Sequence, residues 1–324
     1  MNLKGIENKK TSLLIEIARA YYEENRTQSE IAASTGVTRS QISRYLKEAR
    51  KLGIVQIRIV DPESEFEDLV ASMKQRFPHL RDVIVAPVYI NHPESTLEIV
   101  GRYAANYLLN VVSSGMRVVI GCGRTLRVAV LSLTPRGIPN VSVIQAMGNL
   151  GHEAHGIDYN EITRVAAHAF GAKPYFISSP AILGEGSGNA ADIVNANKTI
   201  RDVLEMAHRG DIYVVGLGTV KSDQLYVRVG MIQQKELDEL GGNAAGDIFG
   251  RFFDIRGNEL SSAFAERIIG VELEDLRRSN LSIGVAAGPD KAAPLLGALR
   301  GKFINVVVSD ENTIQSVIAM NESK

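Results

Sequence analysis

Apolar residues recur at three- and four-residue steps in two stretches of the first fifty residues, which is the pattern of helices with one buried face. The positions are Leu14, Ile17, Ala18 and Tyr21 in the first stretch and Ile42, Tyr45, Leu46 and Ala49 in the second. The second helix is expected from about Arg39 to Leu52. Apolar residues then alternate with Gln56 and Arg58 between Ile54 and Val60, which predicts a strand.

Two pairs of polar residues carry the signature that starts a helix. Thr27 with Glu30, and Thr38 with Gln41, fit the S/T-x-x-E/Q capping box, in which the first side chain bonds a backbone amide and the second reaches back. Gly36 lies between them, where a left-handed residue can end the first helix and let the chain turn. This spacing predicts a helix-turn-helix, and the strand after it indicates a winged variant.

The polar face of the second helix carries residue types that read DNA. Base contacts are expected near the start of such a helix, because that part enters the major groove, where Arg can hold guanine and Gln can hold adenine. The residues predicted to contact DNA are Thr38, Arg39, Ser40, Gln41, Ser43, Arg44 and Lys47. Lys47, Arg50 and Lys51 lie further along and are expected to meet phosphates. The alternative is an ordinary helical hairpin with solvated charges.

From residue 82 onward, short β-branched runs alternate with helical patterns, which is typical of parallel strands joined by crossover helices. The expected strands are Asp82–Ala86, Arg117–Gly121, Val141–Ala146, Pro174–Ser178, Asp211–Leu217, Leu281–Ala287 and Phe303–Ser309. The expected helices lie near 95–113, 125–133, 160–171, 190–208, 233–240, 290–299 and 311–320. The sequence therefore predicts an α/β fold with a doubly wound sheet. The expected parts are a DNA-binding head (1–60), a linker helix from about Glu65 to Arg76 within 61–81, and a body (82–324).

Charge separates the head from the body. Residues 1–60 contain 11 Lys and Arg against 6 Asp and Glu, whereas the remaining chain contains 25 against 31. A basic head on an acidic body indicates a polyanion partner for the head. We expect a cytoplasmic protein without a membrane partner, because no apolar run is long enough to span a bilayer and no signal peptide is evident. The single cysteine, Cys122, and the scattered histidines predict no metal site.

Ligands of doubly wound sheets bind at the carboxyl ends of the strands. Gly121, Gly123, Arg124 and Thr125 follow one expected strand and precede a helix, where backbone amides, the helix N-terminus and two side chains can hold a phosphate. A tight turn that binds nothing is the alternative. Cys122 is interpreted as a small residue beneath this loop and not as a nucleophile.

Three further candidates follow other expected strands. Gly218 and Thr219 form a second glycine loop, and Asp247 lies between glycines, where a carboxylate can accept hydrogen bonds from two sugar hydroxyls. Lys291 falls in the first turn of an expected helix, where the dipole disfavours a cation unless an anion is near. A turn-forming Asp and a solvated Lys are the alternatives.

Taken together, these segments resemble one known family, the SorC/DeoR-type sugar-responsive bacterial transcription regulators. The resemblance lies in TQSEIA and SRYLKEARKLGIVQIRI in the head, and in GCGRTL, GDIFGRFFD and AAGPDKAAPLLGALRGKFINVVVSDE in the body. It implies a body similar to sugar-phosphate isomerases that binds an effector and controls a DNA-binding tetramer. It further implies phosphate contacts at Gly121, Gly123, Arg124 and Thr125, a sugar contact at Asp247 and a ligand-facing Lys291. Cys122 stands where the family commonly has tryptophan.

The expected function is therefore control of carbohydrate metabolism by a regulator whose operator binding responds to a sugar or sugar phosphate. We expect no cofactor, a phosphorylated sugar or polyol as effector, operator DNA as partner, and a homo-oligomer, either dimer or tetramer. The alternative is a sugar-phosphate isomerase-like enzyme with a DNA-binding head. For that enzyme, Asp247, His152, His155 or His168 would supply the base, although His168 is expected in the core.

Overall fold

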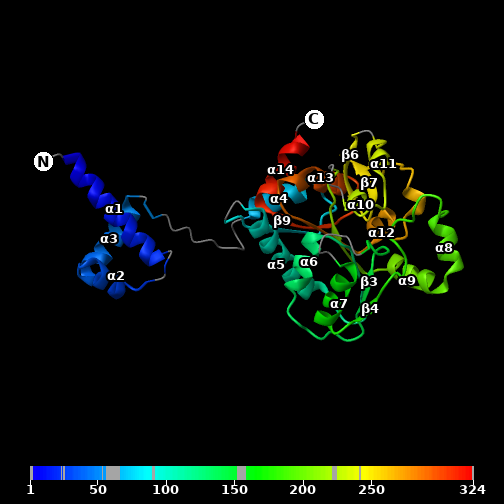
Figure 1. Cartoon of the computed structure of the whole chain (residues 1–324), viewed down its shortest axis with the longest axis horizontal. Helices are drawn as coiled ribbons and strands as arrows, with labels where there is room; N and C mark the ends of the chain where they lie inside the picture. Colours follow the sequence, from blue (N-terminus) through cyan, green and yellow to red (C-terminus); the bar gives the residue numbers. More distant parts are fainter. Residues whose placement is uncertain are drawn as a thin grey trace. The chain divides into compact units, whose positions relative to one another are not determined.

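Contacts within the chain separate two units, residues 1–65 and residues 66–324, and each is described by itself (Figure 1). The computed structural model describes residues 3–22, 24, 26–52, 54–55, 66–89, 92–151, 158–220, 225–240 and 242–322, without the side chains of residues 3–10. The first unit contains α1 (Leu3–Tyr22), α2 (Gln28–Thr35) and α3 (Arg39–Lys51). The expected strand Ile54–Val60 lies, from residue 56 onward, outside the described residues.

Both predicted capping boxes are present in the head. The Thr27 amide donates to Glu30 Oε2 at 2.7 Å, and the Thr38 amide donates to Gln41 Oε1 at 2.9 Å. In return, each threonine hydroxyl accepts a hydrogen bond from the amide three residues later. Gly36 ends α2 in the left-handed conformation with φ of 71°, as its position predicts. The helix starts and the turn between them are thus fixed by local sequence.

The head has its own small hydrophobic core. Ile17 of α1, Ile31 of α2, and Ile42 and Leu46 of α3 pack together and are almost fully buried. These positions come from the apolar faces that the helical period predicts. The three helices therefore form one packed unit, which leaves the polar side of α3 exposed to solvent.

The second unit is built on a parallel sheet with the strand order β1-β9-β8-β5-β2-β3-β4. Its strands are β1 (Asp82–Ala86), β2 (Arg117–Ile120), β3 (Ser142–Gln145), β4 (Lys173–Tyr175), β5 (Ile212–Gly216), β8 (Leu281–Ala286) and β9 (Val306–Asp310). A separate antiparallel hairpin is formed by β6 (Ala244–Ile248) and β7 (Arg251–Asp254). The expected doubly wound parallel sheet is confirmed.

Helices cover both faces of this sheet (Figure 1). They are α4 (Glu67–Arg76), α5 (Pro93–Val111), α6 (Arg124–Leu131), α7 (Tyr159–Phe170), α8 (Ala190–Ala196), α9 (Lys198–His208), α10 (Leu225–Arg228), α11 (Gln234–Asp238), α12 (Leu273–Arg278), α13 (Ala292–Arg300) and α14 (Glu311–Glu322), with short 3₁₀ turns η1 (Ala265–Arg267) and η2 (Pro289–Lys291). Successive strand residues point to opposite faces, so Val118 and Ile120 pack against α5, α6 and α7, whereas Val119 faces the other core.

The helix expected to link head and body belongs to the second unit. In the observed α4, Met73 is fully buried, and Phe77 just after the helix is buried in the same core. The sequence did not decide whether the apolar face of this helix packs on the body or on a second subunit. In the structure, this face packs on the body. Within the described part of the chain, no helix is both long and apolar enough to cross a membrane.

The structure differs from the prediction at one expected helix and at one hairpin that was not expected. The helix expected over 190–208 is divided at Asn197, whose φ of −118° and ψ of 97° are extended and separate α8 from α9. The hairpin β6–β7 was not among the expected strands. Its turn places Phe249 and Gly250 at φ of 56° and 76°, the two positive angles that a two-residue hairpin turn requires.

Candidate nucleic-acid interface and effector site

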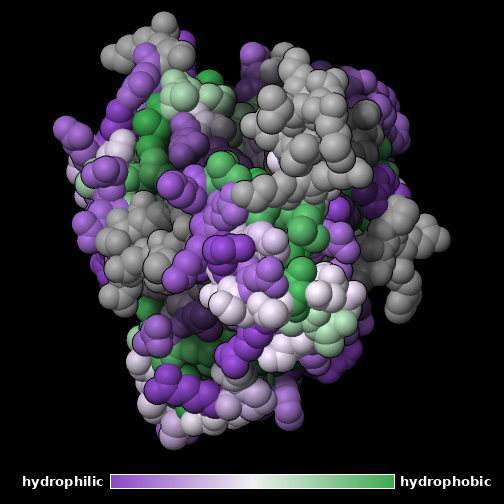
Figure 2. All heavy atoms as spheres, turned by 90° about the vertical axis from the view of Figure 1, so that its left-hand side faces the viewer, coloured by the Kyte–Doolittle hydropathy of each residue, from purple (hydrophilic) through white to green (hydrophobic). Residues whose placement is uncertain are grey.

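The polar side of α3 forms a groove on the head. This groove has a volume of about 520 Å³ and is lined by Gln28, Arg39, Ser40, Ser43, Arg44 and Lys47. Five of the seven residues predicted to contact DNA thus share one concave surface. Gln28, at the start of α2, was not predicted, because a residue beside the first cap gives no signal of groove lining. On the face drawn in Figure 2, hydrophilic residues lie among intermediate and hydrophobic ones.

The two remaining predicted residues hold the helix start instead of lining the groove. Gln41 Oε1 accepts hydrogen bonds from the Thr38 amide at 2.9 Å and from the Thr38 hydroxyl at 3.0 Å. A bidentate contact with adenine needs both the oxygen and the nitrogen of a side-chain amide. Gln41 would therefore have to leave the cap to make such a contact, and in this arrangement it positions the helix.

The effector candidates lie where the winding of the sheet reverses. β2 and β5 are neighbours, yet the chain proceeds from β2 towards β4 on one side and from β5 towards β9 on the other. A crevice is expected at the carboxyl ends of two such strands. The Gly121 amide donates to the Val214 carbonyl at 2.9 Å, so the loops after β2 and β5 are adjacent.

The loop after β2 has the geometry of an anion site. Gly123 caps the start of α6 with φ of 138° and has no side chain with which to bond the first amides. Those amides and the positive end of the helix therefore remain available to an anion. Arg124 is exposed and Thr125 is half-buried at the same end. A side chain at Gly121 would collide with the Phe249 ring, its methyl lying 2.7 Å from Cε1.

The other three candidate segments meet beside the loop after β5. Gly218 and Asp247 form a β-bridge in which the Gly218 amide donates to the Asp247 carbonyl at 2.9 Å. Asp247 is buried, and its Oδ2 accepts from the Gly250 amide at 3.1 Å. Lys291 Nζ donates to the Leu217 carbonyl at 2.6 Å. The structure thus brings Gly218, Asp247 and Lys291 together, and Thr219 is the next residue of the same loop.

A half-buried thiol and a buried hydroxyl lie at the carboxyl ends of β2 and β3. Burial raises the pKa of Cys122 to about 12, so the thiol is protonated at neutral pH and is a poor nucleophile. The Tyr159 hydroxyl donates to the Ile120 carbonyl at 2.6 Å and accepts from the Ala146 amide at 2.9 Å. It thereby ties together the carboxyl ends of β2 and β3. Burial also raises the pKa of Tyr159, which keeps it a donor.

A cavity of about 490 Å³ lies at the ends of β3 and β4, one strand away from this crevice. It is lined by Asn149, Asn160, Arg164, Phe176, Ile177, Ser178, Ser179 and Pro180. None of these residues was a predicted contact, and only Asn149 lies in a glycine-containing loop after a strand. The buried Gln145 connects two sides of the cavity, because it donates to Asn160 Oδ1 and accepts from the Ile177 amide.

Of the histidines considered as bases, His168 is the one that lies in the described part of the chain. His168 is exposed on the last turn of α7, so its expected place in the core is wrong. The reason is that it falls on the polar side of an amphipathic helix. His152 and His155 lie outside the described residues. In the part of the chain that the structure describes, no three His, Cys, Asp or Glu side chains are grouped as metal ligands.

Comparisons with known proteins agree with this two-part architecture. Residues 61–319 match the family described as "Putative sugar-binding domain". The chain is 31% identical to the deoxyribonucleoside regulator of Bacillus subtilis, over 97% of this chain and 99% of that protein. It is 29% identical to the sorbitol operon regulator of Klebsiella pneumoniae, over 94% and 97%. The full-length structure of that regulator, SorC, covers 95% of this chain and 98% of its own, with a TM-score of 0.71.

Proposed function

This chain belongs to the sugar-binding-domain family of transcription regulators, and from that premise we propose that it binds operator DNA under the control of a sugar or sugar phosphate. The convergence of Gly121–Thr125, Gly218, Asp247 and Lys291 at the carboxyl ends of β2 and β5 is the observation that carries the effector half of the proposal. The groove on α3 supports the DNA-binding half of the proposal. The relatives named above are regulators of deoxyribonucleoside and sorbitol genes, which supports control of carbohydrate metabolism.

The head is proposed to read DNA through the exposed side of α3. Arg39, Arg44 and Lys47 line its groove without a carboxylate among the lining residues, so the surface is cationic. Arg44 is the proposed base-reading residue, because it lies near the helix start and can bond guanine at two atoms. Lys51, at the end of α3, is proposed to contact a phosphate, which adds affinity without sequence preference.

DNA binding is tested by comparing specific with nonspecific affinity. Operator sequences are first selected from a random pool with the full chain, and Arg44→Ala is then compared with Lys51→Ala on selected and on random DNA. Arg44→Ala should cost about 1–3 kcal/mol on selected DNA and much less on random DNA. Lys51→Ala should weaken both alike. Equal losses from Arg44→Ala on the two DNAs would remove its base-reading role.

The body is proposed to bind a phosphorylated sugar or polyol and no cofactor. The phosphate would be held in the loop of Gly121, Gly123, Arg124 and Thr125 by the first amides of α6 and the side chains of Arg124 and Thr125, because Gly123 gives this helix start no side-chain cap. Gly121 would shape the loop, since its own amide is bonded to the Val214 carbonyl. Asp247 would accept hydrogen bonds from sugar hydroxyls, and Lys291 would face the anionic ligand from the other side of the Gly218 and Thr219 loop. These roles follow from the placement of the four segments at the carboxyl ends of β2 and β5, where doubly wound sheets bind ligands.

Regulation is proposed to act through a homo-oligomer, either a dimer or a tetramer. Two heads are needed to read two half-sites, and the spacing of those heads decides whether one operator fits both. An effector changes this spacing only by its different affinity for the two arrangements, on the scale of about 1–3 kcal/mol. Because operator DNA is the partner, we propose that the protein acts in the cytoplasm.

In the described part of the chain, Asp247 is the one nominated base of the enzyme alternative that lies at the carboxyl ends of β2 and β5. Isomerisation needs a positioned group that exchanges a proton near neutral pH. The groups beside Asp247 include Tyr226 and Cys122, and burial raises the pKa of both, so both stay protonated. His168 is exposed on α7. These observations support ligand binding over turnover, and release of product from any sugar phosphate, lost in Asp247→Asn, would reverse the assignment.

A thermal-shift screen tests the effector site. The full chain is heated with free sugars, polyols and sugar phosphates, and a compound that binds the folded body raises its Tm. Arg124→Ala should reduce the shift from phosphorylated compounds more than the shift from free sugars. Arg209→Ala is the matched control, since Arg209 is also exposed but precedes β5, at the opposite edge of the sheet. Equal shifts in both variants would contradict the phosphate assignment.

A further inference from the structure

Tyr226 of α10 is buried beside the effector crevice, although no motif of the sequence includes it. Its side chain is 6% exposed, and the hydroxyl lies 3.8 Å from Met147 Sδ. A methyl group at Gly250 would lie 3.6 Å from Tyr226 Cζ, so the phenol end of the ring faces the turn between β6 and β7. The same turn carries the Gly250 amide that bonds Asp247 Oδ2. Tyr226 and Asp247 are therefore neighbours.

The two oxygens of Asp247 have different surroundings. Oδ2 accepts from the Gly250 amide at 3.1 Å. Oδ1 lies over Gly218, because a methyl group at Gly218 would overlap Oδ1 while it stayed 3.2 Å from Oδ2. Gly218 directly follows β5 at the crevice. One side of the carboxylate is thus held by the hairpin turn, and the other side is presented to the strand ends.

We propose that Tyr226 is a positioning residue, whose hydroxyl donates a hydrogen bond to Asp247 and holds the carboxylate in the orientation that accepts hydroxyls of the effector. The inference rests on the proposed function of Asp247. A further donor beside the Gly250 amide restricts the plane of the buried carboxylate more tightly and stabilises its charged form. Met147 Sδ is a weak acceptor, so it competes little for the hydroxyl proton.

The charge state of Tyr226 fits this role. Burial raises its pKa well above the ordinary value, and the charge of Asp247 and a hydrogen bond to Asp247 act in the same direction. The phenol therefore remains a donor throughout the pH range in which the protein would work. The Asp247 carboxylate, in turn, is an acceptor for ligand hydroxyls, which favours a polyol or sugar over a deoxygenated analogue.

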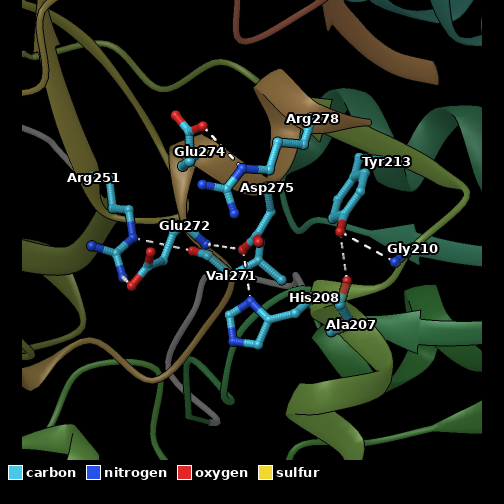
Figure 3. Close-up of polar contacts among 10 residues, drawn as sticks. All are labelled: Ala207, His208, Gly210, Tyr213, Arg251, Val271, Glu272, Glu274, Asp275 and Arg278. Atoms are coloured by element: carbon cyan, nitrogen blue, oxygen red, sulfur yellow. Dashed lines mark hydrogen bonds and ion pairs between the residues drawn. The ribbon is translucent and has the colours of Figure 1, made fainter. Parts of the chain in front are cut away.

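The test compares Tyr226→Phe with Tyr213→Phe, which loses a similar buried hydroxyl far from the crevice. The Tyr213 hydroxyl donates to the Ala207 carbonyl at 2.7 Å and accepts from the Gly210 amide at 3.2 Å, as Figure 3 shows. Tyr213 lies near the amino end of β5, whereas the crevice lies at its carboxyl end. Both variants keep the ring, so both should fold, and thermal unfolding would verify this.

The first readout needs no ligand. The full chain is labelled with ¹³C at aspartate carboxyls, and the Asp247 signal is identified by its loss in Asp247→Asn. Tyr226→Phe should raise the titration midpoint of that signal by about one pH unit, since a donor to the charged form is gone. Tyr213→Phe should leave the midpoint in place. An unchanged midpoint in Tyr226→Phe would overturn the inference.

The second readout separates this inference from the proposed function. Binding of ribose 5-phosphate and glucitol 6-phosphate is measured by calorimetry. Where Asp247→Asn weakens binding of either probe, Tyr226→Phe should weaken it about tenfold, and Tyr213→Phe less than twofold. If Asp247→Asn weakens binding but Tyr226→Phe does not, the positioning role is wrong and the site stands. If Asp247→Asn leaves binding unchanged, the sugar contact itself is wrong.

Discussion

Gly218→Ala should destabilise the body and disturb the effector crevice at once. The added methyl group would overlap Oδ1 of Asp247 and lie 2.7 Å from its Cγ. The carboxylate has little freedom to yield, because Asp247 is 4% exposed and its Oδ2 is bonded to the Gly250 amide. Moving the backbone instead would separate the bridge in which the Gly218 amide bonds the Asp247 carbonyl at 2.9 Å.

The cost combines two effects. Overpacking a buried site costs about 1–3 kcal/mol, and losing one hydrogen bond to a buried charge costs about 1.5–3 kcal/mol. The two costs do not add in full, because a movement that breaks the hydrogen bond also relieves the overlap. We therefore expect a loss of about 2–4 kcal/mol in the free energy of unfolding. Urea unfolding of the full chain measures it.

Gly216→Ala is the matched control in the same segment. A methyl group there would meet the Cys122 carbonyl at 3.5 Å and Leu126 Cγ at 3.6 Å, which are ordinary contacts. That variant should stay within about 1 kcal/mol of the parent chain. If both variants lose the same stability, Gly218 is not constrained by Asp247 and the close packing of the crevice is refuted.

Three further outcomes are expected. Thr38→Ala should lower the unfolding free energy of the head by about 1 kcal/mol in calorimetry, because α3 loses its cap. Cys122 should react with a thiol reagent at pH 8 much more slowly in the folded chain than after denaturant is added, since desolvation raises its pKa to about 12 and lowers its thiolate fraction. Burial raises the pKa of Asp275, but hydrogen bonds from His208 at 2.7 Å and from the Glu272 amide give a net pKa below 3.8 (Figure 3). The lowered pKa stabilises the folded chain above pH 3.8, and this stabilisation should vanish as the pH falls through the folded pKa of Asp275. The free energy of unfolding of Asp275→Asn should therefore depend less steeply on pH in that range, as urea unfolding at several pH values would measure.

The head was predictable because its signals are local. A capping box is decided by residues three apart, and Gly36 acts on its own φ angle, so Thr27, Thr38 and Gly36 are found as expected. The parallel strands were found for a similar reason, since a strand buried on both faces is a continuous apolar run. The phosphate-loop candidate could be located because it directly follows such a run at β2.

The remaining features depend on contacts that no local pattern contains. The hairpin turns at Phe249 and Gly250, and a phenylalanine with φ of 56° is not a usual turn residue. Tyr226 follows neither a strand end nor a glycine, and it reaches the site only because β6 and β7 fold back onto β5. The cavity beside β3 and β4 depends on the buried Gln145, which reads as one polar residue in an apolar run.

The convergence of distant segments sets what an effector can do. Gly121, Gly218, Asp247 and Lys291 meet only when the sheet is folded, so a ligand that uses them binds the native body and not the unfolded chain. At one hundred times its Kd such a ligand stabilises the body by about 2.7 kcal/mol. That stabilisation is not the regulatory signal, because a ligand with equal affinity for two arrangements of the subunits does not change the ratio between them. Control of the heads therefore depends on contacts that differ between arrangements, and a carboxylate whose orientation is held by a neighbouring element is one contact that can differ.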